Sequence, residues 1–130
     1  MSVRAKKKTY QRGVRSEKLA ALWLQLKGYK ILERRYKTKV GEIDLIARRQ
    51  NNIIFVEVKA RPTVAQALES ITPTMRRRIG NTARYYVSHN DVVDCDLRFD
   101  VVTVTPFKIR NIIKGRFFIH HLDNAWEQEA

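Results

Sequence analysis

GEIDLIARRQNNIIFVEVKAR, residues 41–61, contains two apolar runs of strand length joined by a polar turn. Each run carries charge inside its apolar stretch: Asp44 lies in the first, and Glu57 and Lys59 lie in the second. Burying a charge is costly unless the charge is paired or bound to a ligand. The three side chains therefore need partners, either one another or a bound molecule.

Alternation along a strand places Glu57 and Lys59 on one face. If the four polar residues RQNN form the turn of an antiparallel hairpin, Arg48 lies opposite Ile53. The same register then puts Asp44 opposite Glu57. Two carboxylates that face each other across a ladder repel unless a cation lies between them. Lys59 offsets part of this repulsion, and a divalent metal ion would offset all of it.

Such a cluster suits the hydrolysis of phosphodiesters. Mg²⁺ prefers carboxylate, carbonyl and water oxygens, and proteins usually hold it through one or two carboxylates. Asp44 and Glu57 could share the ion, and the Val58 carbonyl could supply a third oxygen. Lys59 could orient the attacking water or contact the phosphate as a point charge. The alternative is a structural ladder of ion pairs at a solvated sheet edge, and the hairpin alone leaves both readings open.

Net charge is the strongest global signal. Against 13 acidic residues the chain has 26 Lys and Arg, which gives a formal charge of +13 and a pI near 10.3. This excess indicates a polyanionic partner, with nucleic acid ahead of acidic lipid and DNA ahead of RNA. No run approaches the roughly 18 apolar residues of a membrane span, so we expect no membrane partner and a cytoplasmic location.

The length of 130 residues predicts one domain with a single core. Residues 1–12 are basic and lack the apolar segment of a secretory signal, so we expect a flexible basic arm followed by a domain over 13–130. Cys95 is the only cysteine, which excludes an internal disulfide and a cysteine-based zinc site.

Local patterns predict helices and strands in alternation. Helices are expected at 16–28, at 64–70 after a cap at Thr63, and from Pro73 onward after a cap at Thr72. Strands are expected at 29–37, 41–48, 52–60, 97–104 and 116–122, followed by a helical turn at 124–130 pinned by Trp126. This order predicts an α/β protein with a mixed central β-sheet flanked by helices.

The first helix has two candidate faces at helical spacing. One is the apolar stripe Leu19, Leu22, Trp23 and Leu26, and the other is a small-residue edge with Glu17, Ala20, Ala21 and Leu24. Glu17 thus points toward packed structure, although as a first-turn acid it could serve only the helix dipole, which is worth about 0.3–1 kcal/mol.

Several other charged residues have two readings. On the third helix, an inward stripe leaves four arginines outside it, Arg76, Arg77, Arg78 and Arg84, which form either a phosphate-binding ridge or a solvated face. Arg61, directly after the second strand of the hairpin, is a better placed phosphate ligand. Arg98 and Asp100 share a strand face and are expected to form an internal ion pair. His89, His120 and His121 lack partners at ligand spacing, so histidine catalysis is not expected.

The spacing of Asp44 and Glu57-Val58-Lys59, with a helix glutamate upstream, resembles the PD-(D/E)XK nuclease superfamily. More closely, the chain resembles the YraN family of small bacterial proteins. The match covers roughly residues 13–126 and lies in four segments: GVRSEKLAALWLQLKGYKIL (13–32), GEIDLIA (41–47), FVEVKAR (55–61) and RFD (98–100). Two positions depart from the pattern of the resemblance. Ile43 precedes Asp44 where the superfamily's name has proline, and this chain lacks the lysine that relatives tend to carry near Met75, where Arg76 is the available substitute.

The resemblance implies a restriction-endonuclease-like fold and a Mg²⁺- or Mn²⁺-dependent endonuclease similar to archaeal Holliday-junction resolvases. By position, Asp44 and Glu57 would bind the metal, Lys59 would be the lysine of the E-x-K element, and Glu17 would complete the metal shell. Glu42, one pleat from Asp44 on the same face, would support these ligands rather than bind the metal.

The expected function is therefore cleavage of DNA phosphodiester bonds, on branched or recombination intermediates. Resolving a junction needs two coordinated cuts, which makes a homodimer a further expectation. The main alternative is a module that holds nucleic acid on a nuclease-like scaffold without cutting it. A third is an adaptor whose basic surface docks onto a protein.

Overall fold

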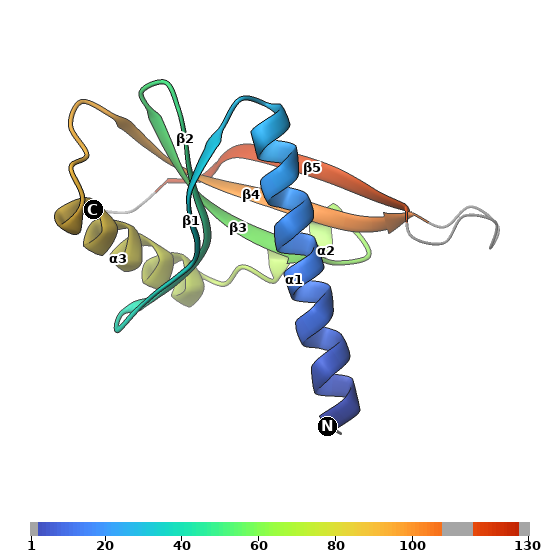
Figure 1. Cartoon of the computed structure of the whole chain (residues 1–130). Coiled ribbons are helices and arrows are strands. Elements are labelled where there is room, and N and C mark those ends of the chain that lie inside the picture. The colour runs from blue at the N-terminus through green and yellow to red at the C-terminus, as the bar shows by residue number, and fades with distance from the viewer. Residues whose placement is uncertain (1–2, 108–115, 128–130) are drawn as a thin grey trace.

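The computed structural model describes residues 3–107 and 116–127 (Figure 1). Its elements are α1 (Val3–Leu26), β1 (Lys30–Thr38), β2 (Gly41–Arg49), β3 (Asn52–Ala60), α2 (Val64–Glu69), α3 (Pro73–His89), β4 (Asp96–Phe107) and β5 (Arg116–Trp126). The predicted α/β class is confirmed, and the arrangement is consistent with a restriction-endonuclease-like fold. None of the helices in the described ranges is long and apolar enough to cross a membrane.

The five strands form one mixed sheet in the order β1-β2-β3-β4-β5. All neighbours are antiparallel except β3 and β4, which are parallel and are joined through α2 and α3. Helix α1 packs on one face of the sheet and α3 packs on the other. Figure 1 shows the N-terminal part of α1 extending beyond the sheet. Two apolar layers therefore enclose β2 and β3, the strands that carry the charged hairpin residues.

The predicted hairpin register is confirmed. Arg48 pairs with Ile53, and the pairing continues to Arg49 opposite Asn52, so the turn contains two residues rather than four. Gln50, the first of them, has a φ of 55°. The last pair of this ladder is Leu45 with Val56. The next two residues, Asp44 and Glu57, are therefore level with each other but lie outside the regular ladder.

The predicted apolar stripe of the first helix is wrong. Leu22 and Leu26 are 53% and 74% exposed, whereas Ala20, Ala21 and Leu24 are fully buried. Small residues let the helix approach a sheet face that is already filled by branched side chains such as Val56 and Val102. The helix also starts earlier than expected, at Val3.

The C-terminal helical turn is also wrong. Residues 124–126 belong to β5, Glu127 belongs to no helix or strand, and residues 128–130 of that turn lie outside the described ranges. Trp126 does anchor this end, because its ring stacks on Phe99 with centroids 5.3 Å apart. Both predicted helix caps are confirmed: the hydroxyl of Thr63 accepts from the Gln66 N–H, and that of Thr72 accepts from the Met75 N–H.

Candidate functional site

The charged residues of the hairpin meet α3 in a cleft at the start of β2. The cleft encloses about 360 Å³ and is lined by Gly41, Glu42, Asp44, Glu57, Lys59, Met75, Arg78 and Ile79. A larger cleft of about 580 Å³ lies elsewhere, between α3, β4 and the end of β5, and its lining is mostly apolar. The smaller cleft thus collects four hairpin residues that the sequence singled out and one of the four arginines of α3.

Gly41 brings the start of β2 close against α3. A Cβ atom at this position would lie 2.7 Å from Thr82 Oγ1 and 3.3 Å from the Arg78 carbonyl oxygen. The φ of Gly41 is 155°, which side chains rarely adopt. Because Thr82 Oγ1 donates to the same Arg78 carbonyl at 2.8 Å, the contact fixes the helix turn that carries Arg78 beside the cleft.

Asp44, which is partly buried, and Glu57, which is buried, form a carboxyl pair, as the register predicted. Burial, followed by the negative charge of Asp44, raises the pKa of Glu57 to about 8. Burial also raises the pKa of Asp44, although the Val58 N–H donates to Asp44 Oδ2 at 2.8 Å. The two side chains are hydrogen-bonded to each other, so at neutral pH the pair holds a proton between its oxygens.

The hydrogen bond from Val58 follows from the end of the β2–β3 ladder. Beyond Leu45 and Val56 the strands no longer pair regularly, and the Asp44 carboxylate accepts an N–H that a main-chain carbonyl would otherwise accept. Val58 was expected to contribute its carbonyl oxygen to a metal. The contact that the structure shows is made by its N–H, and the role of the carbonyl stays a prediction.

This donor set fits a hard divalent cation. Lys59 Nζ lies 3.5 Å from Glu57 Oε1, so a single ammonium group faces two carboxyl groups. A proton shared by the pair occupies the place where a cation with oxygen preference would be stabilised by both acids. Asp44 and Glu57 could therefore hold a cation between them, whereas in a structural ladder each acid would have its own basic partner.

Glu17 lies near this pair without joining it. Arg35 Nε donates to Glu17 Oε2 at 2.7 Å, and the two side chains are 35% and 20% exposed. After burial and hydrogen bonding, the negative charge of Glu17 is a further influence that raises the pKa of Asp44, which places the two carboxylates within electrostatic range. Glu17 is thus more than a helix-dipole acid, but its carboxylate is committed to Arg35.

The other predicted phosphate ligands lie outside the cleft lining. Arg76 packs over the Trp126 ring, with its guanidinium carbon 5.7 Å from the centroid. Arg77 donates to Thr74, Arg84 donates to Asn81, and Arg61 donates to the Ala60 carbonyl. Of the arginines in α3, Arg78 lines the cleft that contains the two acids. Glu42 also lines the cleft and is exposed, in keeping with its expected place beside Asp44.

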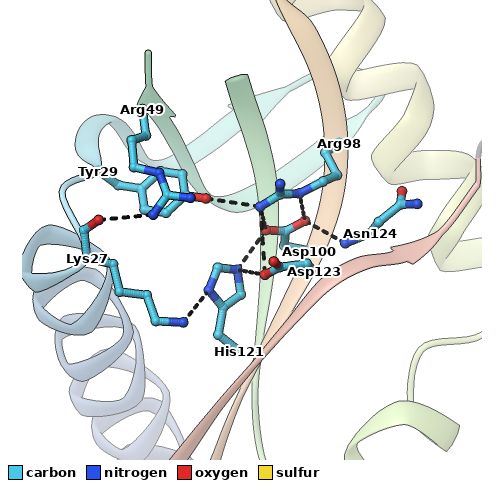
Figure 2. Close-up of polar contacts among 8 residues, drawn as sticks. All are labelled: Lys27, Tyr29, Arg49, Arg98, Asp100, His121, Asp123 and Asn124. Carbon is cyan, nitrogen blue, oxygen red and sulfur yellow. Dashed lines mark hydrogen bonds and ion pairs between the residues drawn. The ribbon is translucent and has the colours of Figure 1, made fainter. Parts of the chain in front are cut away.

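A second polar cluster lies around Asp100 of β4, close to the end of α1 (Figure 2). Arg98 donates to both oxygens of Asp100 at 2.8 Å, which confirms the predicted ion pair. His121 Nε2 lies 2.7 Å from Asp100 Oδ2, and the Asn124 N–H donates to Oδ1 at 2.9 Å. Burial alone raises the pKa of Asp100, but these hydrogen bonds outweigh it and hold the pKa below its ordinary value.

The same cluster could hold a metal ion, because Asp100, His121 and Asp123 offer ligand atoms within 4.8 Å of one another. Its charges are already balanced, however. Arg98 pairs with Asp100, and Lys27 Nζ lies 2.9 Å from His121 Nδ1. A divalent ion at this cluster would be repelled by both cations, Arg98 and Lys27. The cluster therefore has mainly a structural role, because its contacts connect the end of α1 with β4 and β5, as Figure 2 shows.

Sequence reasoning missed two parts of these sites. Alternation indicates that His121 and Asp123 share a strand face, but only the pairing of β4 with β5 brings them to Asp100. The loop between these strands gives no sign of that register. Arg35 was read as part of a basic strand end, and nothing local in the sequence connects it with Glu17.

Comparison with known proteins gives a consistent family assignment. Residues 16–104 match the model described as uncharacterised protein family UPF0102. A UPF0102 protein of Bartonella bacilliformis is 44% identical over 93% of this chain and 99% of its own length. A UPF0102 protein from a Chelativorans species is 48% identical over 86% of this chain and 94% of its own length. A UPF0102 protein of Methylocella silvestris is 53% identical over 74% of this chain and 78% of its own length. The chain therefore belongs to family UPF0102, the YraN-like family that its sequence motifs indicated.

Proposed function

We propose that this protein is a metal-dependent endonuclease that hydrolyses DNA phosphodiester bonds at the cleft between β2, β3 and α3. The observation that carries the proposal is the close pair of Asp44 and Glu57, two carboxyl groups that share a single basic partner, Lys59. Perturbed carboxylates of this kind in a cleft are candidates for catalytic sites. The resemblance to PD-(D/E)XK nucleases supports the proposal, because it implies metal ligands at the same two positions.

Each residue of the cleft has a chemical role in this proposal. Asp44 and Glu57 would supply the carboxylate oxygens that hold Mg²⁺ or Mn²⁺, and Glu57 would hold the ion in its deprotonated form. The bound ion supplies an acidified water and a positive charge against the phosphate. Lys59, on the same strand face as Glu57, orients the attacking water and contacts a phosphate oxygen.

The substrate class follows from charge. A net +13 attracts a polyanion over a distance of about a Debye length, roughly 8 Å at physiological salt. At short range, Arg78 presents an exposed guanidinium beside the two acids, where a phosphate oxygen could accept from it. DNA with branched or recombination structure is the substrate that the family resemblance favours.

The test is a cleavage assay with Mg²⁺ or Mn²⁺ on junction, flap, single-stranded and linear DNA. Asp44→Asn and Lys59→Ala should abolish cleavage and leave DNA binding largely intact, because neither change removes the basic surface. Asp123→Asn, an exposed acid of the other cluster, is the matched control and should cut like the parent. Cleavage of branched DNA by Asp44→Asn at the parental rate would refute the mechanism.

A non-catalytic nucleic-acid-binding module is the second candidate. The Glu17–Arg35 ion pair favours it, because the carboxylate that would complete a metal shell is engaged elsewhere. Under this alternative, binding is strong and salt-sensitive, with a slope near −0.9 per neutralised phosphate of duplex DNA, and no metal-stimulated product forms on any substrate.

A further inference from the structure

Arg35 occupies an unusual position beside the carboxyl pair. In the β1–β2 ladder, Arg34 pairs with Leu45 and Tyr36 pairs with Ile43, so Arg35 stands level with Asp44. Its φ is 51°, in the left-handed region that non-glycine residues seldom adopt. The guanidinium is nevertheless bonded to Glu17 of α1, 2.7 Å away. Arg35, whose backbone lies level with Asp44, thus forms an ion pair with an acid of α1.

The charges around the site show what would change this arrangement. Three carboxylates and two cations lie around the site. The acids are Glu17, Asp44 and Glu57, and the cations are Arg35 and Lys59. Once a divalent cation has replaced the proton that Asp44 and Glu57 share, the group carries one positive charge in excess, and a single phosphodiester then restores balance. The exposed pair Glu42 and Arg78 at the cleft adds one charge of each sign and leaves this balance unchanged. The metal and the nucleic acid should therefore bind more tightly together than separately.

We propose that Arg35 is a substrate-sensing latch that holds Glu17 away from the metal until a phosphodiester enters the cleft. The phosphate competes for the Arg35 guanidinium, which is well suited to phosphate oxygens. Glu17, released from its ion pair, becomes available as a third carboxylate ligand beside Asp44. Arg35 is a positioning residue in this scheme, because it acts on the metal through Glu17. The inference rests on the proposed function, since it assumes that the ion binds at Asp44 and Glu57.

The geometry makes such an exchange accessible. The Arg35 and Glu17 side chains are 35% and 20% exposed, so neither must leave a sealed interior. An ion pair with this exposure is worth up to about 1 kcal/mol, which corresponds to a factor of at most roughly five in an equilibrium constant. A phosphate at the cleft can therefore outcompete Glu17 for Arg35. An isolated Mn²⁺ ion would be repelled by the guanidinium.

The test is calorimetric titration of the full-length protein with Mn²⁺, with and without a DNA duplex that carries cleavage-resistant phosphorothioate linkages. In the parent, the duplex should tighten Mn²⁺ binding. Arg35→Gln frees Glu17, so this variant should bind Mn²⁺ up to roughly fivefold more tightly than the parent without DNA and should gain less from the duplex. Arg34→Gln removes a neighbouring exposed arginine on the same strand and should behave like the parent.

The outcomes separate the latch from the function on which it rests. A gain in Mn²⁺ affinity supports the latch, because loss of a merely structural ion pair would not tighten metal binding. The double variant Glu17→Gln, Arg35→Gln should lose that gain. If Arg35→Gln matches Arg34→Gln with and without DNA, the latch is wrong while the metal site stands. If Mn²⁺ binding is unaffected by Asp44→Asn even with DNA, the proposed function itself is wrong.

Discussion

Glu57→Gln should stabilise the metal-free protein at alkaline pH and have little effect at acidic pH. In the parent, burial and the neighbouring Asp44 raise the pKa of Glu57 to about 8, from an ordinary value of 4.5. The folded state therefore keeps a proton over a pH range in which the unfolded chain has lost it. Glutamine has the shape of protonated glutamate and can still donate to Asp44, but it cannot ionise.

The sign and size follow from proton linkage. Because the folded protein binds the extra proton between pH 4.5 and 8, its free energy of unfolding falls as pH rises through that range. Each pKa unit corresponds to about 1.4 kcal/mol, so the whole difference is on the order of 5 kcal/mol. About 4 kcal/mol of this falls between pH 5 and pH 9. The variant should escape that loss, so its advantage over the parent should grow by a few kcal/mol across the interval.

Urea unfolding at pH 5, 7 and 9 in the presence of a chelator measures this advantage directly. Taking the difference between variant and parent cancels every other titrating group that the two chains share. Glu42→Gln, which removes an exposed acid of the same cleft, is the control and should show no pH-dependent advantage. If the Glu57→Gln advantage were the same at pH 5 and pH 9, Glu57 would not keep its proton in the folded state, and a cation between the two acids would lose its support.

Three further changes test the surroundings of the site. Asp100→Asn leaves the partly buried Arg98 without its carboxylate partner and should lower the free energy of unfolding by about 3 kcal/mol. Asp123→Asn changes an exposed partner of the same arginine and should have little effect in the same urea experiment. Gly41→Ala places a Cβ atom 2.7 Å from Thr82 Oγ1 and should destabilise by about 1–3 kcal/mol; adding Thr82→Ala, which removes that contact, should recover part of the loss. Arg78→Ala should reduce kcat/KM for DNA cleavage more than Arg84→Ala, because Arg78 lines the cleft with the two acids, and equal effects of the two changes would contradict this placement.

Local sequence patterns predicted most of the fold because they act over a few residues. The caps at Thr63 and Thr72 and the alternation of the hairpin strands depend on neighbours along the chain, and the structure confirms them. The register was predictable because a short turn fixes it, which brought Asp44 level with Glu57. Local patterns could not decide which of the two candidate faces of the first helix packs against the sheet. The choice depended on the shape of the sheet beneath it, where small residues fit and Leu22 did not.

The contacts that the sequence did not predict join distant segments. Glu17 meets Arg35 because β1 has a register shift and a residue at positive φ, and neither feature has a local signature at an arginine. His121 meets Asp100 because β5 pairs with β4 at a register that the intervening loop does not specify. Side-chain partners that depend on tertiary register are visible only after the sheet has formed.

The two buried acid sites of the sheet differ in how their charge is balanced. Asp100 receives hydrogen bonds from Arg98, His121 and the Asn124 N–H, and its pKa falls below the ordinary value, so the folded state gains stability from the ionised carboxylate. Asp44 and Glu57 have raised pKa values, and the folded state loses stability when both ionise. The fold is thus able to surround a buried carboxylate with donors, as it does at Asp100. A purely structural pair at the hairpin would be balanced in the same way, whereas a ligand that binds only the folded state can restore the stability lost there. This contrast is the physical reason to look for a cation between Asp44 and Glu57.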